Sequence, residues 1–148
     1  MIKIFYKNEL FSIKNDELNN IIFLICNGEK VNKEQQQLYH EKLIELIKNY
    51  ELLKKKVSLV FNIGKNKNPA KLINFINREV KFQKEYENYF NKHVDIITIT
   101  VNSNILKTLF NTTIKLFRKK DTNVKLQINN SFEESLDFIK NFKILKTE

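Results

Sequence analysis

Apolar residues along this chain follow two different periods, and the two kinds of segment alternate. The uninterrupted apolar run at 21–26 and the mainly apolar segment 57–63 are typical of strands that are covered on both faces. At 33–53 and 69–89, apolar residues instead recur every three or four positions, which predicts helices with one buried face. Such alternation is the pattern of a mainly parallel sheet whose strands are joined by covering helices.

Short β-rich segments precede this alternation, and the same pattern continues after it. Segments 2–6 and 10–13 are separated by a polar turn and predict a hairpin. The later part of the chain predicts, in order, a strand at 94–101, a helix to about 117, a strand at 125–128 and a last helix opened by a capping box of Ser131 and Glu134. We therefore predict an α/β fold: a mainly parallel sheet with an N-terminal antiparallel meander and about four helices.

Composition indicates a single domain over 1–148. The 148 residues are 42% hydrophobic and include 12 Phe, which is enough for one packed core, and with only 2 Gly and 1 Pro nothing marks a linker. The longest apolar run is too short to cross a bilayer, and the N-terminus lacks a secretory signal, so we expect a cytoplasmic protein. The lone Cys26 closes an apolar strand, and we interpret it as a small buried side chain.

The formal net charge of +9 is concentrated in the middle of the chain. Residues 65–120 hold 12 Lys and Arg residues against 4 acidic residues. One interpretation is a basic surface that attracts an anionic partner. The other is coding bias, because heavy use of Lys, Asn, Ile and Phe is typical of AT-rich genomes, including those of some large DNA viruses; a viral protein would then lie in the virion or the infected host cell.

Two stretches resemble a known family. The step Ile25-Cys26-Asn27-Gly28 before a helix start at Asn32-Lys33-Glu34 resembles the STAS domain of anti-sigma-factor antagonists. Residues 56–142 are similar in spacing to the related STAS-like and CRAL-TRIO branch, including the stretch Asn102-Ser103-Asn104 and the serine-started last helix. The resemblance implies an α/β interaction module. It is a resemblance of pattern, which speaks more to fold than to function.

The chain also departs from that family in two respects. STAS antagonists carry a phosphorylatable serine directly after the second core strand, whereas residues 62–68 here contain no Ser or Thr. We therefore expect no phosphorylation switch in this loop. Lipid-transfer members of the CRAL-TRIO branch have an additional helical domain that 148 residues cannot hold, so we do not expect a large lipid ligand.

Three polar segments follow the predicted parallel strands, at 62–68, 102–104 and 129–131. In open parallel sheets, ligands and partners bind at this carboxyl edge, where helix N-termini favour anions. The candidate partner- or anion-binding residues are Lys65, Lys67, Asn68, Lys71, Asn102, Ser103 and Asn104. The simpler interpretation, which we favour, is that the Asn and Ser residues only cap helices.

The densest basic cluster is formed by Lys115, Arg118, Lys119 and Lys120. Such a cluster could bind a nucleic-acid backbone, with affinity that falls steeply as salt rises. Alternatively, it is a solvated helix end, where basic side chains favour the negative end of the helix dipole. We favour the solvated helix end, because no nucleic-acid recognition motif accompanies the cluster.

Nothing in the sequence predicts catalysis, a cofactor or a metal centre. His40 and His93 have no second ligand at helical or turn spacing, and the adjacent carboxylates on the predicted helices do not face one another. We therefore expect a non-catalytic protein-interaction or assembly module, not an enzyme. We expect its partner to be an acidic protein or an assembly neighbour, with a homo-oligomer left open.

The alternative function is binding of nucleic acid or an anionic membrane surface through the basic segment 65–120. The two functions predict different surfaces. A nucleic-acid or membrane binder would gather the charge of this segment on one face. An interaction module would expose an apolar patch, for which the candidates are Phe82, Tyr86 and Phe90.

Overall fold

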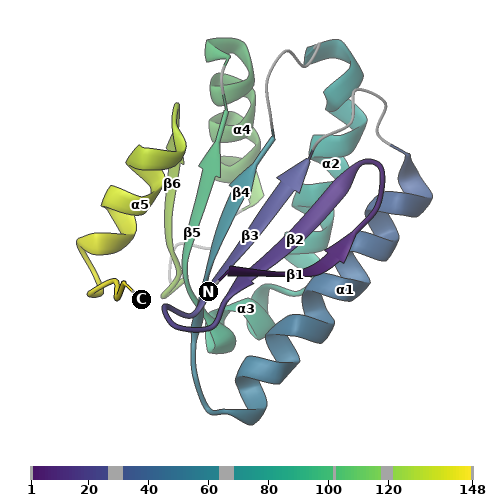
Figure 1. Ribbon diagram of the computed structural model, residues 1–148. Coiled ribbons are helices and arrows are strands. Elements are labelled where there is room, and N and C mark those ends of the chain that lie inside the picture. Colours follow the sequence, from purple (N-terminus) through teal and green to yellow (C-terminus); the bar gives the residue numbers. More distant parts are fainter. Residues whose placement is uncertain (1, 27–31, 64–68, 102, 118–121, 148) are drawn as a thin grey trace.

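The computed structural model describes residues 2–26, 32–63, 69–101, 103–117 and 122–147, and shows a central six-stranded sheet with helices on both faces (Figure 1). In chain order the elements are β1 (Ile2–Lys7), β2 (Phe11–Asp16), β3 (Ile21–Cys26), α1 (Lys33–Leu52), β4 (Val57–Asn62), α2 (Pro69–Glu85), α3 (Glu87–His93), β5 (Val94–Thr100), α4 (Asn104–Phe117), β6 (Lys125–Asn129) and α5 (Phe132–Lys140).

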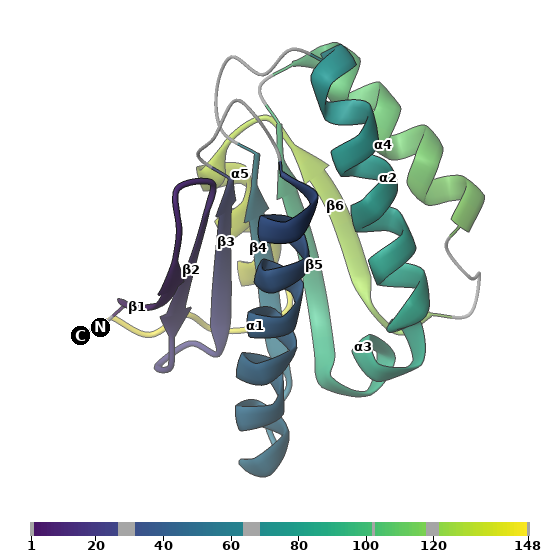
Figure 2. The same cartoon turned by 90° about the vertical axis from the view of Figure 1, so that its right-hand side faces the viewer.

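The strands lie in the sheet in the same order as in the sequence, from β1 to β6. β1, β2 and β3 pair antiparallel, and β3, β4, β5 and β6 pair parallel. The predicted fold class is therefore confirmed. Because each parallel strand is added on the same side of the previous one, right-handed crossovers place α1, α2 and α4 on one face of the sheet, while α5 packs on the other face (Figures 1 and 2).

The described chain has five helices, where the sequence predicted about four. The helix predicted over 69–89 is interrupted at Tyr86, whose backbone (φ −103°, ψ 16°) leaves the helical region. The chain continues as α3 and passes directly into β5. This break turns Phe90 back towards the sheet, where it is buried.

Most of the core lies between the sheet and the helices of the α1 side. Four rings form its centre: Phe11 stacks on Tyr39 with centroids 4.6 Å apart, and Phe75 lies 6.0 Å from both Phe11 and Phe61. A smaller apolar cluster lies under α5 and includes Phe23, Val60 and Ile139. Cys26 is fully buried, as predicted.

The predicted helix starts are confirmed where the structure describes them. The Asn32 side chain accepts a hydrogen bond from the Glu34 backbone N–H at 2.8 Å. Ser131 accepts from the Glu134 N–H at 3.2 Å, and the Glu134 carboxylate accepts from the Asn130 N–H at 3.1 Å. The capping box is therefore present, with its glutamate bonded one residue ahead of the cap.

Candidate functional site

The carboxyl ends of β4, β5 and β6 lie at one edge of the sheet, because these strands are parallel (Figure 1). Ser103 caps α4: its hydroxyl accepts from the Leu106 N–H at 3.4 Å. Asn104 is the exposed first residue of that helix. Asn129 is buried, and its amide donates to the Ser135 hydroxyl at 3.0 Å. Ser103 therefore acts as a helix cap, and Asn129 bonds within the buried region beside α5.

The remaining candidates at this edge are not described in full. Lys65, Lys67, Asn68 and Asn102 lie outside the described residues, and Lys71 is placed in α2 without a described side chain. Their role in anion binding therefore stays a prediction. The topology provides no crevice for them of the doubly wound type, because the order of the six described strands never reverses.

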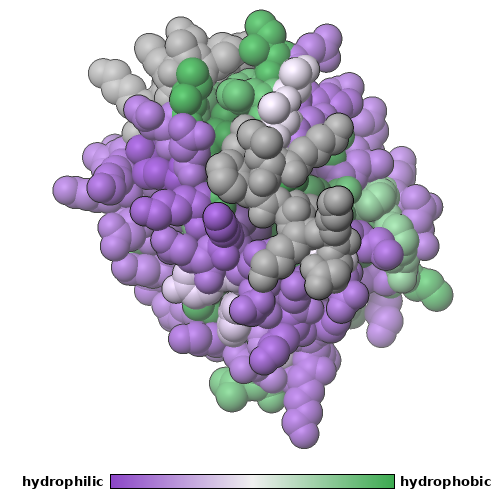
Figure 3. Space-filling view, turned by 180° about the vertical axis from the view of Figure 1, so that it is seen from behind, coloured by the Kyte–Doolittle hydropathy of each residue, from purple (hydrophilic) through white to green (hydrophobic). Residues whose placement is uncertain are grey.

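The predicted basic cluster is also only partly within the described chain. Lys115 belongs to α4, but its side chain is not described, and Arg118, Lys119 and Lys120 lie outside the described residues. Seen from the helix side, the surface is largely hydrophilic and its apolar groups are small (Figure 3). The role of this basic cluster therefore stays a prediction.

The apolar patch predicted at Phe82, Tyr86 and Phe90 is wrong. Phe82 and Phe90 are only 6% and 3% exposed, and Tyr86 alone is exposed, at 37%. Phe82 lies flat against the His40 ring at a centroid distance of 3.8 Å, and Phe90 meets the edge of Phe82 at 5.7 Å. The break at Tyr86 explains the error, because it lets residues on both sides of the break face the core.

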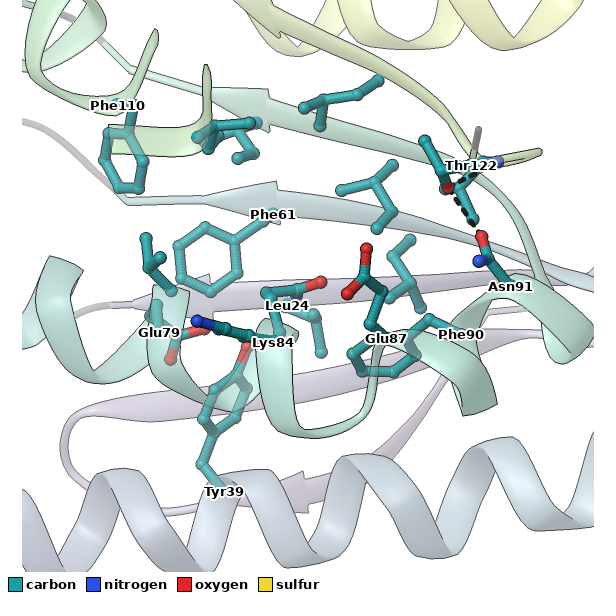
Figure 4. A pocket seen from close by; sticks show the side chains of 18 residues that line it. Leu24, Tyr39, Phe61, Glu79, Lys84, Glu87, Phe90, Asn91, Phe110 and Thr122 are labelled. Carbon is teal, nitrogen blue, oxygen red and sulfur yellow. Dashed lines mark hydrogen bonds between the residues drawn. The ribbon is translucent and has the colours of Figure 1, made fainter. Parts of the chain in front are cut away.

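A cavity of about 130 Å³ lies between the sheet and helices α2, α3 and α4 (Figure 4). Its lining is mainly apolar and comes from strands β3 to β6, the residue before β6 and the three helices: Leu24, Leu59, Phe61, Val80, Phe90, Ile97, Ile99, Phe110, Ile114, Val124 and Leu126. Polar side chains border it, among them Glu79, Lys84, Glu87 and Asn91. The cavity is therefore mainly apolar, with a few polar groups at its border.

Tyr39 is the polar group that reaches this cavity from the core. It comes from α1, is 1% exposed, and points with its hydroxyl towards the side of the cavity that holds Glu79 (Figure 4). Among the described residues, no group forms a hydrogen bond with this hydroxyl. Burial, with a further contribution from the Glu79 charge, raises the pKa of Tyr39 well above 10, so the phenol is neutral and can donate a hydrogen bond.

A polar cluster between α1 and α2 holds Glu79 beside this cavity. One Glu79 carboxylate oxygen accepts from the Gln36 amide at 3.0 Å and lies 2.6 Å from His40 Nε2. Gln36 also donates to the Phe75 carbonyl at 3.1 Å and accepts from the Arg78 guanidinium. The cluster fixes the Glu79 side chain, since its partners are themselves bonded or, for His40, stacked on Phe82.

The two histidines thus have carboxylate partners that sequence reasoning missed. His40 pairs with Glu79, and His93 lies 3.7 Å from Glu51, which also accepts a hydrogen bond from the Tyr89 hydroxyl at 3.2 Å. These pairs join different helices, so helical spacing could not reveal them. Within the described ranges, no three His, Cys, Asp or Glu side chains gather as a metal site would require.

The second hollow lies on the opposite face of the sheet, beside α5. Here one row of side chains crosses four strands: Ile4 is in register with Lys14, Lys14 with Phe23, and Phe23 with Val60. A groove of about 400 Å³ follows this row, and we call its lining residues the open sheet face: Ile2, Ile4, Lys14, Phe23, Ile25, Val60, Asn62 and Phe132. Figure 1 looks onto this face, and no described helix covers its β1 to β3 part.

The open sheet face exposes large apolar side chains. Ile2 and Ile4 are 52% and 62% exposed, and Phe132 is also exposed, with its ring 5.5 Å from that of Phe23. Lys14 is the one charged side chain among the described lining residues. Sequence reasoning treated β1 only as part of a hairpin, and the alternation of Ile2 and Ile4 was the signal that could have indicated an apolar row.

Comparison with protein-family models, curated proteins and solved structures finds no match to this chain. The STAS-like resemblance therefore stays a prediction. The observed structure supports an α/β fold with a mixed six-stranded sheet. Among the described residues, no helix is both long enough and apolar enough to cross a membrane.

Proposed function

We propose that this chain is a non-catalytic protein-interaction module, and that its open sheet face binds an acidic, apolar segment of a partner protein. The observation that carries the proposal is the set of exposed apolar side chains Ile2, Ile4 and Phe132, which line the groove together with Lys14 over a floor of buried Phe23 and Val60. Contiguous apolar surface of this kind is typical of a protein-binding site, because leaving it in water costs free energy that a partner recovers.

The single charge in the groove indicates the chemistry of the partner. Lys14 lies between Ile4 and Phe23 in the row, so apolar side chains of a bound segment would flank its ammonium group. A carboxylate on that segment would pair with Lys14, while a basic segment would be repelled. This supports an acidic protein partner over nucleic acid, for which an apolar groove with one lysine is poorly suited.

The test compares two matched substitutions of exposed isoleucines. Ile4→Asp places a charge in the groove, and Ile73→Asp places the same charge on α2, on the other side of the sheet. Tagged forms of both variants and of the parent are used to capture partners from native extract after nuclease treatment. We expect a discrete protein to be retained by the parent and by Ile73→Asp, and to be reduced at least tenfold by Ile4→Asp.

A second arm tests the charge of the partner. Lys14→Glu reverses the only charge in the described groove and should weaken capture of the same protein, while Lys14→Arg should retain it. Equal capture by Ile4→Asp and Ile73→Asp would contradict the proposal. Loss of all bound material on nuclease treatment would favour nucleic-acid binding through segment 65–120, and self-association abolished by Ile4→Asp would identify a second copy of the chain as the occupant.

A further inference from the structure

We propose that the cavity between the sheet and helices α2, α3 and α4 is a binding site for a small neutral apolar molecule that carries one hydrogen-bond acceptor, such as an aryl ketone, and that Tyr39 donates to this acceptor. The cavity lies on the helix side of the sheet, opposite the open sheet face, so this inference is independent of the proposed docking surface.

Size sets the first limit on the ligand. The cavity holds about 130 Å³, and an engineered apolar cavity of about 150 Å³ in another protein is known to bind benzene. A single ring with a short substituent therefore fits, whereas a long acyl chain does not. The aromatic and aliphatic walls, including Phe61, Phe90 and Phe110, suit a flat apolar ligand.

The Tyr39 hydroxyl sets the polarity. Buried hydroxyls almost always have a hydrogen-bond partner, yet this one has none among the described residues, and it lines the cavity. A single water molecule would not fill this space, because it takes up only about 30 Å³ and most of the cavity wall is apolar. A ligand that brings its own acceptor on an apolar body satisfies the hydroxyl and fills the space.

The neighbouring charges favour a neutral acceptor. Two carboxylates, Glu79 and Glu87, and one ammonium, Lys84, are the described charged groups that border the cavity. The Glu79 charge acts on Tyr39 directly, since it contributes to the raised pKa of the phenol. An anionic ligand would be repelled by this surplus of negative charge, whereas a carbonyl accepts from Tyr39 without adding a charge.

The experiment uses two probes of nearly the same shape. Acetophenone carries a carbonyl, and α-methylstyrene replaces that oxygen with a CH₂ group that accepts no hydrogen bond. Their dissociation constants are measured by NMR titration of the full chain. We expect both to bind, with acetophenone about tenfold tighter, which is the ratio that one additional hydrogen bond provides.

Two tyrosine variants separate the site from general hydrophobic binding. Tyr39→Phe should reduce the affinity ratio of the two probes to about one while both still bind, because only the hydroxyl is removed. Tyr6→Phe is the matched control, since its hydroxyl accepts from Asn8 in the N-terminal hairpin, and it should leave the ratio at its parent value. Ile97→Phe, which adds volume to a cavity-lining position of β5, should weaken both probes.

Three outcomes would overturn the inference: no saturable binding of acetophenone to the parent, equal affinity for the two probes in the parent, or an unchanged ratio in Tyr39→Phe. If Tyr39→Phe does not fold, the parent complex decides the question through nuclear Overhauser effects. Contacts between the acetophenone methyl group and the Phe61 and Phe110 rings would support the site, and their absence would overturn it.

Discussion

Tyr39 and Tyr50 are both buried, but they differ in whether the hydroxyl group has a hydrogen-bond partner. The Tyr50 hydroxyl donates to the Asn15 side chain on β2, whereas the Tyr39 hydroxyl has no partner among the described residues. Burial raises the pKa of Tyr50 to about 12, with further contributions from Glu17 and Asp16, and burial also raises the pKa of Tyr39. Both side chains are therefore neutral in the folded protein at ordinary pH.

These shifts predict a loss of stability in alkali. Above pH 10 a tyrosine of the unfolded chain loses its proton while Tyr50 of the folded chain keeps it up to about pH 12, so ionisation favours unfolding within this window. Below pH 10 the contribution is fully present. Between pH 10 and 12, the unfolding free energy of Tyr50→Phe should therefore fall by about 2–3 kcal/mol less than that of the parent.

The measurement is urea unfolding at a series of pH values, with phenolate absorbance as a direct record of ionisation. Tyr50→Phe should give a shallower fall in unfolding free energy than the parent above pH 10. Tyr86→Phe, at an exposed ring, should give a fall as steep as that of the parent. A parent and a Tyr50→Phe variant with identical slopes would show that Tyr50 titrates normally.

Contacts between single residues were the part of the site that the sequence could not predict. His40 and Glu79 are 39 positions apart, and they meet only because α1 and α2 lie side by side on the sheet. Likewise, the space beside Tyr39 depends on how side chains of eight elements pack. Neither arrangement leaves a periodic signal, whereas burial of Cys26 at the end of an apolar run does.

At the scale of elements, the end of α1 carries a local strain. The Lys54 N–H donates to the Glu51 carbonyl at 2.9 Å, and the Lys55 N–H donates to the Tyr50 carbonyl at 3.0 Å. These two bonds form a Schellman motif, which requires a left-handed residue directly after the cap. Lys54 occupies that position with φ 56°, although glycine adopts this conformation without the steric cost of a Cβ atom.

Lys54→Gly should therefore stabilise the protein by about 0.5–1 kcal/mol, because it removes the left-handed strain at the helix end. The measurement is the midpoint of urea unfolding at constant slope. Lys55→Gly is the control: it removes the same charge one residue later, where φ is not positive, and should be neutral or destabilising. Equal effects of the two substitutions would attribute any gain to charge.

Helix starts were predictable and one helix end was not. Asn32, Ser103 and Ser131 each cap a helix as their sequence positions indicate, because a short polar side chain before an amphipathic run has few alternatives. The sequence around the break at Tyr86 contains neither Pro nor Gly, the residues that usually indicate a helix end. It results from tertiary packing, in which Phe90 is buried against the core, and it removed the patch predicted there.

At the scale of the molecule, the order of the strands decides which faces stay open. The alternation of apolar periods predicted the parallel sheet correctly, since buried strands and covering helices have different periods. It could not show that α1, α2 and α4 all lie on one face, which leaves α5 and the C-terminal residues as the described cover of the other. The open sheet face follows from this one-sided arrangement (Figure 2).

The segment after α5 extends that cover as far as the turn between β2 and β3. The Asn19 amide donates to the Lys146 carbonyl at 3.0 Å and its oxygen accepts from the Lys146 N–H, so one side chain bonds both backbone groups of a single residue. Lys143 donates to the Asn20 carbonyl at 3.2 Å, and burial lowers the pKa of its ammonium. Leu145 packs against the apolar cluster under α5.

Asn19→Ala should release this segment without unfolding the sheet. Both Lys146 bonds are lost together, along with the bond from the Asn19 amide to Asp16, so we expect a loss of about 1–2 kcal/mol in unfolding free energy. Amide exchange at Lys146 should become at least tenfold faster, while exchange within β4 and β5 stays slow because the core does not depend on this contact. Asn123→Ala, at an exposed loop position, should change neither quantity. Unchanged exchange at Lys146 in Asn19→Ala would show instead that Leu145 packing alone holds the C-terminal segment against the sheet.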